Sequence, residues 1–296
     1  MQGKRREKDD TLEHNTSTIE KAVINKAISF ILYNLEEDIS VDDVSSFCGV
    51  SKYHLNRVFK EETGEALYEF IKRNRIERSA WRLKVEKDKS VTEIGSDYGY
   101  SPSNYATEFK KSLHISPTRF RKESEERVEL SSFSHGLKLD DMDRMEKNIT
   151  VESLDDMFVL YERKRGNYHE MPTVWREFIE KYSHLKTPST LYIECTMDDP
   201  SITDEDSCLY EICQTIDPGD KRIKEENLFV KRIKGGKNAV YHFKGKPQFM
   251  YMVYQEIFCR WLIKTGNEMD CRPILDIYRT VKEDGYMEID IYFPIK

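Results

Sequence analysis

The 296-residue sequence predicts a multidomain protein, in which an all-α domain with two helix-turn-helix units precedes an α+β domain of two strand-helix-strand-strand repeats. Three observations predict this organisation. A chain of this length is long for a single core. The pattern of residues 41–60 returns fifty positions later, with its apolar, glycine and serine positions in register. From Ile149 onward, short β-rich runs replace the helical spacing of apolar residues.

The first predicted unit consists of a helix at 41–47, a turn with a glycine, and a helix at 51–62. Ser51 is a good N-cap for the second helix, and Gly64 ends it. Leu55, Val58 and Phe59 share one face of this helix, which can pack on a core. The opposite face carries hydrogen-bonding and basic side chains, namely Tyr53, Asn56, Arg57 and Lys60. One helix with a polar face is weak evidence for a DNA reader, because any surface helix has such a face.

A second copy of the unit covers 91–113. Its equivalences at fifty-residue spacing include Val41 and Val91, Gly49 and Gly99, Ser51 and Ser101, Phe59 and Phe109, and Lys60 and Lys110. A glycine, a helix cap and an aromatic anchor that all keep one register indicate duplication. The predicted outer face of the second helix carries Ser103, Asn104, Thr107, Lys110 and Lys111. Two reading helices in one chain can meet major-groove segments about 34 Å apart.

The flanking segments complete the predicted helical domain at 18–122. Residues 1–17 are polar without apolar periodicity, and we expect a flexible arm there. Apolar residues at helical spacing predict a first helix over 19–35, and a long helix over 66–84 is expected to hold the two units at a fixed separation. Ser116 and Pro117 open a last short helix. Residues 123–148 are rich in charge and serine and are interpreted as a linker, with some helix at 140–147.

Three segments in and directly after the second unit, 99–105, 109–111 and 115–121, are close to a family signature. Through them, residues 18–122 resemble the DNA-binding domain of the AraC/XylS family of transcription regulators. The resemblance implies that Tyr53, Asn56 and Arg57 contact base edges, with Arg57 directed at guanine. It also implies that Lys60, Lys110 and Lys111 contact phosphates, and the exposed residues Ser103, Asn104 and Thr107 complete the expected DNA contacts.

The sequence departs from the family pattern at two places in the second unit. His114 stands where the family usually has glycine, and Thr107 and Glu108 occupy a stretch where an arginine is common. We therefore expect the second helix to read bases weakly and to act mainly as a clamp on the DNA backbone.

The net charge of −7 does not argue against DNA binding, because the excess acid lies after residue 122. Basic residues are concentrated at 72–84, and phosphate contact depends on such local patches. The six cysteines have no metal-binding spacing, so reduced thiols are expected, with Cys208 and Cys213 as an open alternative for a redox pair. We predict no cofactor and no metal. The chain shows no signal peptide and no run long enough to cross a membrane, which indicates a cytoplasmic protein.

The predicted α+β domain covers 149–296. Strands are expected around 158–161, 191–193, 209–213, 238–243, 274–278 and 288–293, and helices over 171–184 and 247–264. The pattern looks doubled about a pseudo-twofold axis. Residues 160–166 correspond to 240–245, each before a helix, and residues 209–212 correspond to 274–277.

The segments 235–240, 261–262, 272–278 and 289–296 resemble the GyrI-like small-molecule-binding domain. The resemblance implies a hydrophobic, often cationic ligand in a cleft between the two halves, facing a carboxylate at the position of Asp276. Strand alternation puts Tyr278 on the same side, and Glu211 is expected as the symmetry partner of Asp276. Aromatic residues that could add cation–π contacts are Tyr168, Trp175, Tyr192, Tyr210, Trp261 and Tyr292.

The sequence thus predicts a transcription regulator that binds double-stranded promoter DNA and senses a small amphipathic or cationic molecule, with RNA polymerase open as a further partner. No catalytic Ser-His-Asp or metal-ligand constellation is visible, so we expect no enzyme activity. Two alternatives for the second domain stay open. It could be a hydrolase that uses Asp276 and Tyr278 for proton transfer, or it could bind a protein partner.

Overall fold

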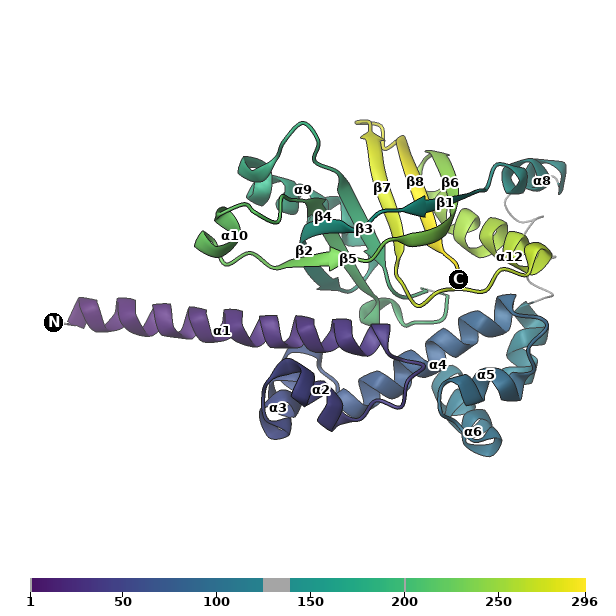
Figure 1. The fold of residues 1–296 in the computed structure, drawn as a ribbon, viewed down its shortest axis with the longest axis horizontal. Coiled ribbons are helices and arrows are strands. Elements are labelled where there is room, and N and C mark those ends of the chain that lie inside the picture. The colour runs from purple at the N-terminus through teal and green to yellow at the C-terminus, as the bar shows by residue number, and fades with distance from the viewer. Residues whose placement is uncertain (1, 125–138, 200) are drawn as a thin grey trace.

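The computed structural model of the protein describes residues 2–124, 139–199 and 201–296 (Figure 1). Its helical domain contains α1 (Gln2–Tyr33), α2 (Val41–Cys48), α3 (Lys52–Thr63), α4 (Leu67–Val85), α5 (Val91–Asp97), α6 (Pro102–Leu113) and a helix over 117–124. The pairs α2–α3 and α5–α6 are the two predicted helix-turn-helix units. Figure 1 shows α3 and α6 at the lower edge of the molecule, on the side of α4 that faces away from the sheet.

The two units begin with the same capping chemistry, which explains why both start at a serine. Ser40 caps α2, and its hydroxyl accepts from the Asp43 backbone while the Asp43 carboxylate accepts from the Ser40 backbone. Ser90 and Glu93 form the same reciprocal box at α5. Each box satisfies two backbone donors that a helix start leaves free. The fifty-residue repeat is therefore a repeat of local folding signals.

Residues 2–17, where the sequence predicts a flexible arm, form the start of α1, which extends back to Gln2. This segment carries no proline and several Lys, Arg and Glu residues, which have high intrinsic helix propensity. The absence of apolar periodicity, on which the expectation rested, excludes a buried face but does not exclude a helix.

The long helix α4 lies at the centre of the protein and takes part in two cores. Leu67, Phe70, Ile71 and Ala80 are buried in the core of the helical domain, as predicted. Trp81, also predicted to be buried, instead belongs to the core of the strand-rich domain. Its ring centroid lies 5.6 Å from that of Phe293. One helix therefore joins the two domains.

The connection between the domains is described only in part. Residues 125–138 of the expected linker lie outside the described residues. The helix expected at 140–147 is confirmed as α8 (Leu139–Lys147). Arg260 ties α8 to the strand-rich domain, because its guanidinium lies 2.7 Å from Asp143.

The strand-rich domain forms one eight-stranded antiparallel sheet with helices on one face. Its strands are β1 (Thr150–Leu154), β2 (Met157–Arg165), β3 (Tyr192–Thr196), β4 (Leu209–Thr215), β5 (Val230–Ile233), β6 (Gly236–Gly245), β7 (Ile274–Val281) and β8 (Met287–Pro294). The helices that cover it are α9 (Met171–Tyr182) and a segment made of α11 (Met250–Met252), a π-helix (Val253–Phe258) and α12 (Cys259–Thr265). The six predicted strands and both helical runs are confirmed.

The strand order, β1-β6-β8-β7-β3-β4-β2-β5, shows the predicted pseudo-twofold. Strands β6, β8 and β7 in one half match β2, β4 and β3 in the other. The short edge strands β1 and β5 were not predicted. The order also corrects one expected equivalence, because residues 209–212 lie in β4, whose counterpart is β8. The counterpart of β7 is β3, and this changes which carboxylate is the partner of Asp276.

Within the described residues, no helix is both long enough and apolar enough to cross a membrane.

Candidate nucleic-acid interface and effector site

The first reading helix, α3, is fixed at both ends by its own sequence. The Ser51 hydroxyl accepts a hydrogen bond from the His54 backbone at 3.2 Å, and Gly64 ends the helix in the left-handed conformation at φ 76°. Leu55, Val58 and Phe59 are fully buried, as the helical wheel predicts. This packing leaves the opposite face in solvent. The predicted contacts Tyr53, Arg57 and Lys60 are exposed, and Asn56 is half-exposed.

Arg57 is exposed but it is not free. Its guanidinium lies 3.0 Å from the Glu20 carboxylate on α1 and 2.8 Å from that of Glu61 one turn along α3. A fork of five donors can hold a carboxylate or a guanine edge, so these acids occupy the donors that a base contact needs. The predicted guanine contact therefore requires that Arg57 exchange its carboxylate partners for DNA.

The second reading helix, α6, has the same division of faces. Tyr105 and Phe109 are buried, and the Tyr105 hydroxyl donates to Ser79 of α4 at 2.9 Å, which fixes α6 on the long helix. Gly95 of α5 allows this approach, because a Cβ there would lie 2.6 Å from the Tyr105 ring. All five predicted contact residues of this helix are exposed: Ser103, Asn104, Thr107, Lys110 and Lys111.

The basic residues at 72–84 do not form the expected phosphate patch, because most of them bind acids or carbonyls within the protein. Lys72 pairs with Glu108 of α6 at 2.6 Å, and Arg82 pairs with Glu86 at 2.7 Å. Arg75 donates to the carbonyls of Leu35 and Glu37. These residues hold the helices together.

A pair of buried carboxylates lies at the centre of the sheet. Glu194 of β3 and Asp276 of β7 are directly paired across the two strands, so their side chains share a face, the one covered by the helices. They are 5% and 1% exposed. The Tyr278 hydroxyl donates to Glu194 at 2.8 Å, and the Tyr254 hydroxyl, from the π-helix, donates to both oxygens of Asp276. Among the described residues, no cationic side chain reaches either acid.

This environment makes the charged form of both acids costly. Burial raises the pKa of Glu194 to about 7, against the opposing effect of the Tyr278 hydrogen bond. Burial, and then the neighbouring Glu194, raise the pKa of Asp276 well above its usual value. Burying a carboxylate without a counter-charge is unfavourable, so the pair is an acceptor for positive charge.

Aromatic residues of both halves surround the acid pair. The Trp175 ring lies 5.2 Å from Tyr278 and 6.1 Å from Tyr192, and Tyr168 lies 5.2 Å from Tyr210. Two buried hydroxyl groups of this wall, Tyr168 Oη and Tyr192 Oη, find no hydrogen-bond partner in the described part of the chain. Buried polar groups are normally paired. The wall therefore offers both aromatic faces and unused hydrogen-bonding groups.

Three of the residues predicted for the ligand lie elsewhere. Glu211 is on the opposite face of the sheet. It pairs with Cys195, whose side chain points away from that of its neighbour Glu194 on β3. Tyr292 pairs with Leu275 and also lies on that opposite face. Trp261 is buried in the core beneath α12. Asp276, Tyr278, Tyr168 and Tyr192 lie together around the acid pair.

Two residues of the site were not predicted, Glu194 and Tyr254. The signal for Glu194 was present, since an acid in the middle of an otherwise apolar strand is costly without a role. Tyr254 had no such signal. Its direction depends on the π-helix, whose extra residue per turn has no simple mark in the sequence.

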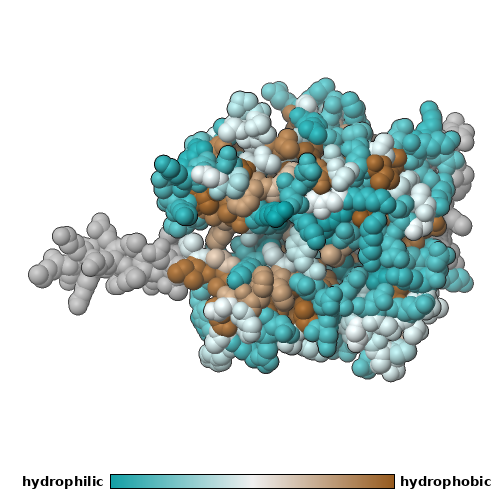
Figure 2. Space-filling view, in the orientation of Figure 1, coloured by the Kyte–Doolittle hydropathy of each residue, from teal (hydrophilic) through white to brown (hydrophobic). Residues whose placement is uncertain are grey.

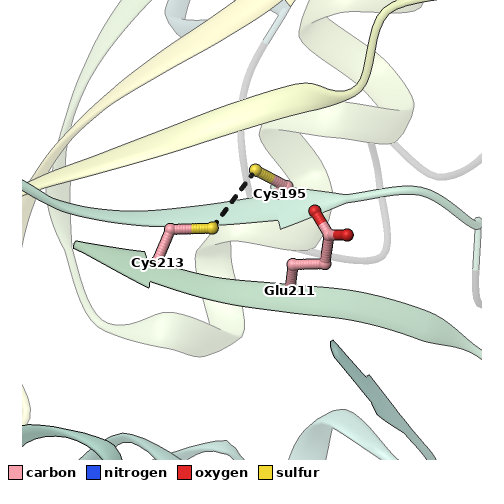
Figure 3. Close-up of side chains that lie close together, drawn as sticks. All are labelled: Cys195, Glu211 and Cys213. Carbon is pink, nitrogen blue, oxygen red and sulfur yellow. Dashed lines mark hydrogen bonds between the residues drawn. The ribbon is translucent and has the colours of Figure 1, made fainter. Parts of the chain in front are cut away.

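A second buried cluster, Cys195, Glu211 and Cys213, does not fit a metal ion (Figure 3). Both oxygens of Glu211 already bind cations, Arg163 at 2.6 Å and Lys231. Burial raises the pKa of Cys213 well above its usual value, so its thiol stays protonated. The sulfur atoms of Cys195 and Cys213 lie 3.8 Å apart. Cys213 thus neighbours Cys195, while Cys208, its expected redox partner, donates to the Thr203 carbonyl.

Two family models match the chain in succession. A helix-turn-helix domain matches residues 44–123, and an integron-associated effector binding protein matches residues 150–295.

Known proteins match the helical part. The probable transcription factor PqrA of Proteus vulgaris is 33% identical over 102 residues, which cover 33% of this chain and 83% of PqrA. The multiple antibiotic resistance protein MarA of Escherichia coli K12 is 32% identical over 108 residues, covering 36% of this chain and 82% of MarA. A solved AraC-type transcriptional regulator from Chromobacterium violaceum is 27% identical, with a TM-score of 0.33, and covers 35% of this chain and 92% of that one. The printed names of PqrA, a probable transcription factor, and of AarP of Providencia stuartii, a helix-turn-helix transcriptional activator that is 34% identical over 103 residues, agree with the expected transcription regulator.

Proposed function

Because the chain belongs to the AraC family of DNA-binding transcription regulators and carries a C-terminal effector-binding domain, we propose that a lipophilic cation in that domain controls its binding to a promoter. The acid pair of Glu194 and Asp276 carries the proposal. Two adjacent carboxylates buried under aromatic rings, with hydroxyl donors but no cationic partner among the described residues, favour a ligand that brings positive charge and apolar surface.

For DNA, we propose that α3 reads bases and α6 grips the backbone. Tyr53, Asn56 and Arg57 would face base edges, with Arg57 on guanine, and Lys60 would contact phosphate. On α6, Lys110 and Lys111 would contact phosphate, with Ser103, Asn104 and Thr107 beside them. The exposure of all these side chains on two similarly built helices supports this assignment. We place the regulator in the cytoplasm, with RNA polymerase as its further partner.

For the effector, we propose that the cation takes the place of the Tyr254 hydroxyl at Asp276. The cation would lie between Glu194 and Asp276, with Trp175, Tyr192 and Tyr278 against its apolar surface. The rings attract a cation through their quadrupoles, by about 0.5–2 kcal/mol each. The pKa of Glu194 near 7 supports the assignment, because a bound cation lets this acid ionise at neutral pH at little cost.

The effector half of the proposal is tested with tetraphenylphosphonium, in which four phenyl rings surround one positive charge. Calorimetric titration of the full chain should show saturable binding, while neutral triphenylphosphine oxide should bind far more weakly. Asp276→Asn should weaken cation binding at least 10-fold. Glu288→Gln is the control, because Glu288 lies on the adjacent strand β8 and pairs with Lys244, and it should leave cation binding unchanged. Equal binding of the cation and the neutral compound would contradict the proposal, and binding of neither would favour a protein partner for this domain.

The DNA half is tested by selecting bound duplexes from a random pool. Arg57→Ala should weaken binding to the selected duplex by about 1–3 kcal/mol and relax the preference at one base pair. Arg119→Ala serves as the matched control, because Arg119 is exposed on the helix at 117–124 and pairs with Glu123. A loss that is the same for every duplex sequence would contradict base reading by Arg57.

A further inference from the structure

Both carboxylates of the effector site connect to one lysine of the DNA-binding domain. Lys84 is in the last turn of α4 and reaches across the domain boundary. Its ammonium group lies 2.7 Å from Asp199, 2.9 Å from the Ser201 hydroxyl and 3.0 Å from the Gln255 side-chain oxygen. All three partners belong to the strand-rich domain.

Each partner segment leads back to one acid of the effector site. Gln255 directly follows Tyr254, the π-helical residue that donates to Asp276. Asp199 lies in the loop that follows β3, the strand that carries Glu194. The Gln255 amide also donates to Asp199 at 2.8 Å, which links the segment after β3 to the π-helix. Lys84 is thus the point at which the two halves of the effector site meet the helix that holds α3 and α6.

The cluster is buried enough for its contacts to matter. The Lys84 and Asp199 side chains are only 12% and 2% exposed. Burial opposes ionisation of Asp199, but the charge of Lys84 and the hydrogen bonds from Lys84, Ser201 and Gln255 together outweigh it and hold the pKa of this carboxyl below its usual value. A partly buried pair of this kind is screened little by solvent, unlike an exposed surface pair.

The π-helix at Val253–Phe258 carries both Tyr254 and Gln255. A π-helix closes its hydrogen bonds one residue further along than an α-helix, and short π segments are rare and frequently lie at functional sites. A change of Val253–Phe258 from π to α turns the side chains within it relative to the flanking helices. Tyr254 and Gln255 are adjacent, so they move together.

We infer that Lys84 couples the effector site to the reading helices: when a ligand displaces Tyr254 from Asp276, Gln255 leaves Lys84, and α4 changes its position on the strand-rich domain. This inference rests on the proposed function and adds its mechanism. Because Tyr105 of α6 is bonded to Ser79 of α4, a movement of α4 is passed on to the second reading helix.

The test uses the full chain, tetraphenylphosphonium and the selected duplex. The measured quantity is the coupling factor, the ratio of the duplex Kd values with and without saturating cation. We expect a factor of about 5 or more, in either direction, for the unaltered chain. Gln255→Met should bring the coupling factor below 2, while the cation Kd changes less than about 3-fold.

The Gln255→Met variant keeps the side-chain length and the Lys84–Asp199 ion pair. Lys84→Met is a second variant for the same link, and Lys244→Met, which breaks only the Glu288 pair on the sheet, should keep the full factor.

Linkage provides an internal check, because the duplex must change the cation Kd by the same factor. Melting temperatures confirm that each variant is folded. A Gln255→Met variant and a folded Lys84→Met variant that bind the cation and keep the full coupling would overturn the inference and leave the effector site standing. A coupling factor of 1 in the unaltered chain, with the cation bound, would overturn it as well. An unaltered chain that binds no cation would overturn the proposed function, and the inference with it.

Discussion

His114 occupies a backbone conformation that glycine adopts at much lower cost. It ends α6 with φ 60°, whereas the equivalent end of α3 has Gly64 at φ 76°. A side chain in this region clashes with its own backbone. We therefore expect His114→Gly to raise the free energy of unfolding by about 0.5–1 kcal/mol, after the larger unfolded-state entropy of glycine is included. Urea denaturation followed by circular dichroism measures this.

The first unit provides the matched control for the His114 prediction. Gly64→Ala should lower the free energy of unfolding by about 1 kcal/mol, because it introduces the strain that His114→Gly removes. A His114→Gly variant less stable than the unaltered chain would show that the imidazole makes a compensating interaction. The prediction for the second unit would then be wrong.

Glu194 should make the protein less stable as the pH rises. Its folded pKa of about 7 lies above the value of about 4.3 expected when unfolded, so the folded state binds the extra proton between these values. The free energy of unfolding therefore falls as the pH rises through this window. Glu194→Gln cannot ionise, and at pH 8 it should be more stable than the unaltered chain by on the order of 2 kcal/mol. The advantage should shrink toward pH 4.5.

The measurement for Glu194 is the unfolding free energy of both proteins at pH 4.5, 6 and 8. Glu283→Gln is the control for the removal of one carboxylate, since Glu283 is exposed in the turn between β7 and β8. A constant difference between Glu194→Gln and the unaltered chain at all three pH values would show that Glu194 ionises normally.

At the scale of elements, α1 contacts α3, the proposed reading helix of the first unit, through an ion pair. Glu20 of α1 holds Arg57 of α3 at 3.0 Å. The proposed contact of Arg57 with DNA requires this ion pair to break, which would leave the Glu20 carboxylate without its partner next to a polyanion. We expect Glu20→Gln to tighten binding of the selected duplex about 2- to 5-fold, in keeping with an exposed ion pair. Fluorescence anisotropy at low salt measures this, and Glu123→Gln, which breaks the pair with Arg119, serves as the control. Unchanged or weaker binding of the Glu20 variant would contradict the prediction.

The elements themselves were largely predictable, because their signals are local. The serine caps, the left-handed Gly49 and Gly64, and the alternation of the strands fixed the units where the structure has them. Which strands are counterparts in the two halves of the sheet could not be predicted from local signals, because it depends on their order in the sheet. The segment Leu209–Ile212 resembles Ile274–Ile277 in sequence, but pairing across the sheet makes β3 the counterpart of β7. The strands β3 and β4 have similar apolar alternation, so the sequence does not show which of them is the counterpart of β7. The sequence pattern therefore indicates Glu211 as the partner of Asp276, whereas the structure has Glu194 there.

At the scale of the whole molecule, the role of the α4 bases could not be predicted. The partner of Lys84 is Asp199, 115 residues later, and Glu77 accepts from Thr203, 126 residues later. A stretch with many bases on one helix is typical of a phosphate-binding surface. Only the packing of the two domains shows that α4 binds the effector domain with one side and carries the reading helices on the other.

Trp81 should therefore control whether the two domains unfold together. It projects from α4 into the strand-rich core, where it is 8% exposed. Trp81→Ala removes a large buried ring at the boundary, at a cost of about 3–5 kcal/mol. We expect scanning calorimetry to show one transition for the unaltered chain and two separate transitions for the variant.

Phe178→Ala distinguishes the loss of the Trp81 contact between the two domains from a general loss of stability. Phe178 is 1% exposed and lies in a core formed by α9 and the half of the sheet that contains β2 and β4. Its removal costs a similar free energy but leaves α4 in place, so the transition should move to lower temperature without splitting. A single transition in Trp81→Ala at the temperature of the Phe178→Ala variant would show that the domains are joined by other contacts. The coupling assigned to α4 would then have to pass through the Lys84 cluster without support from this core.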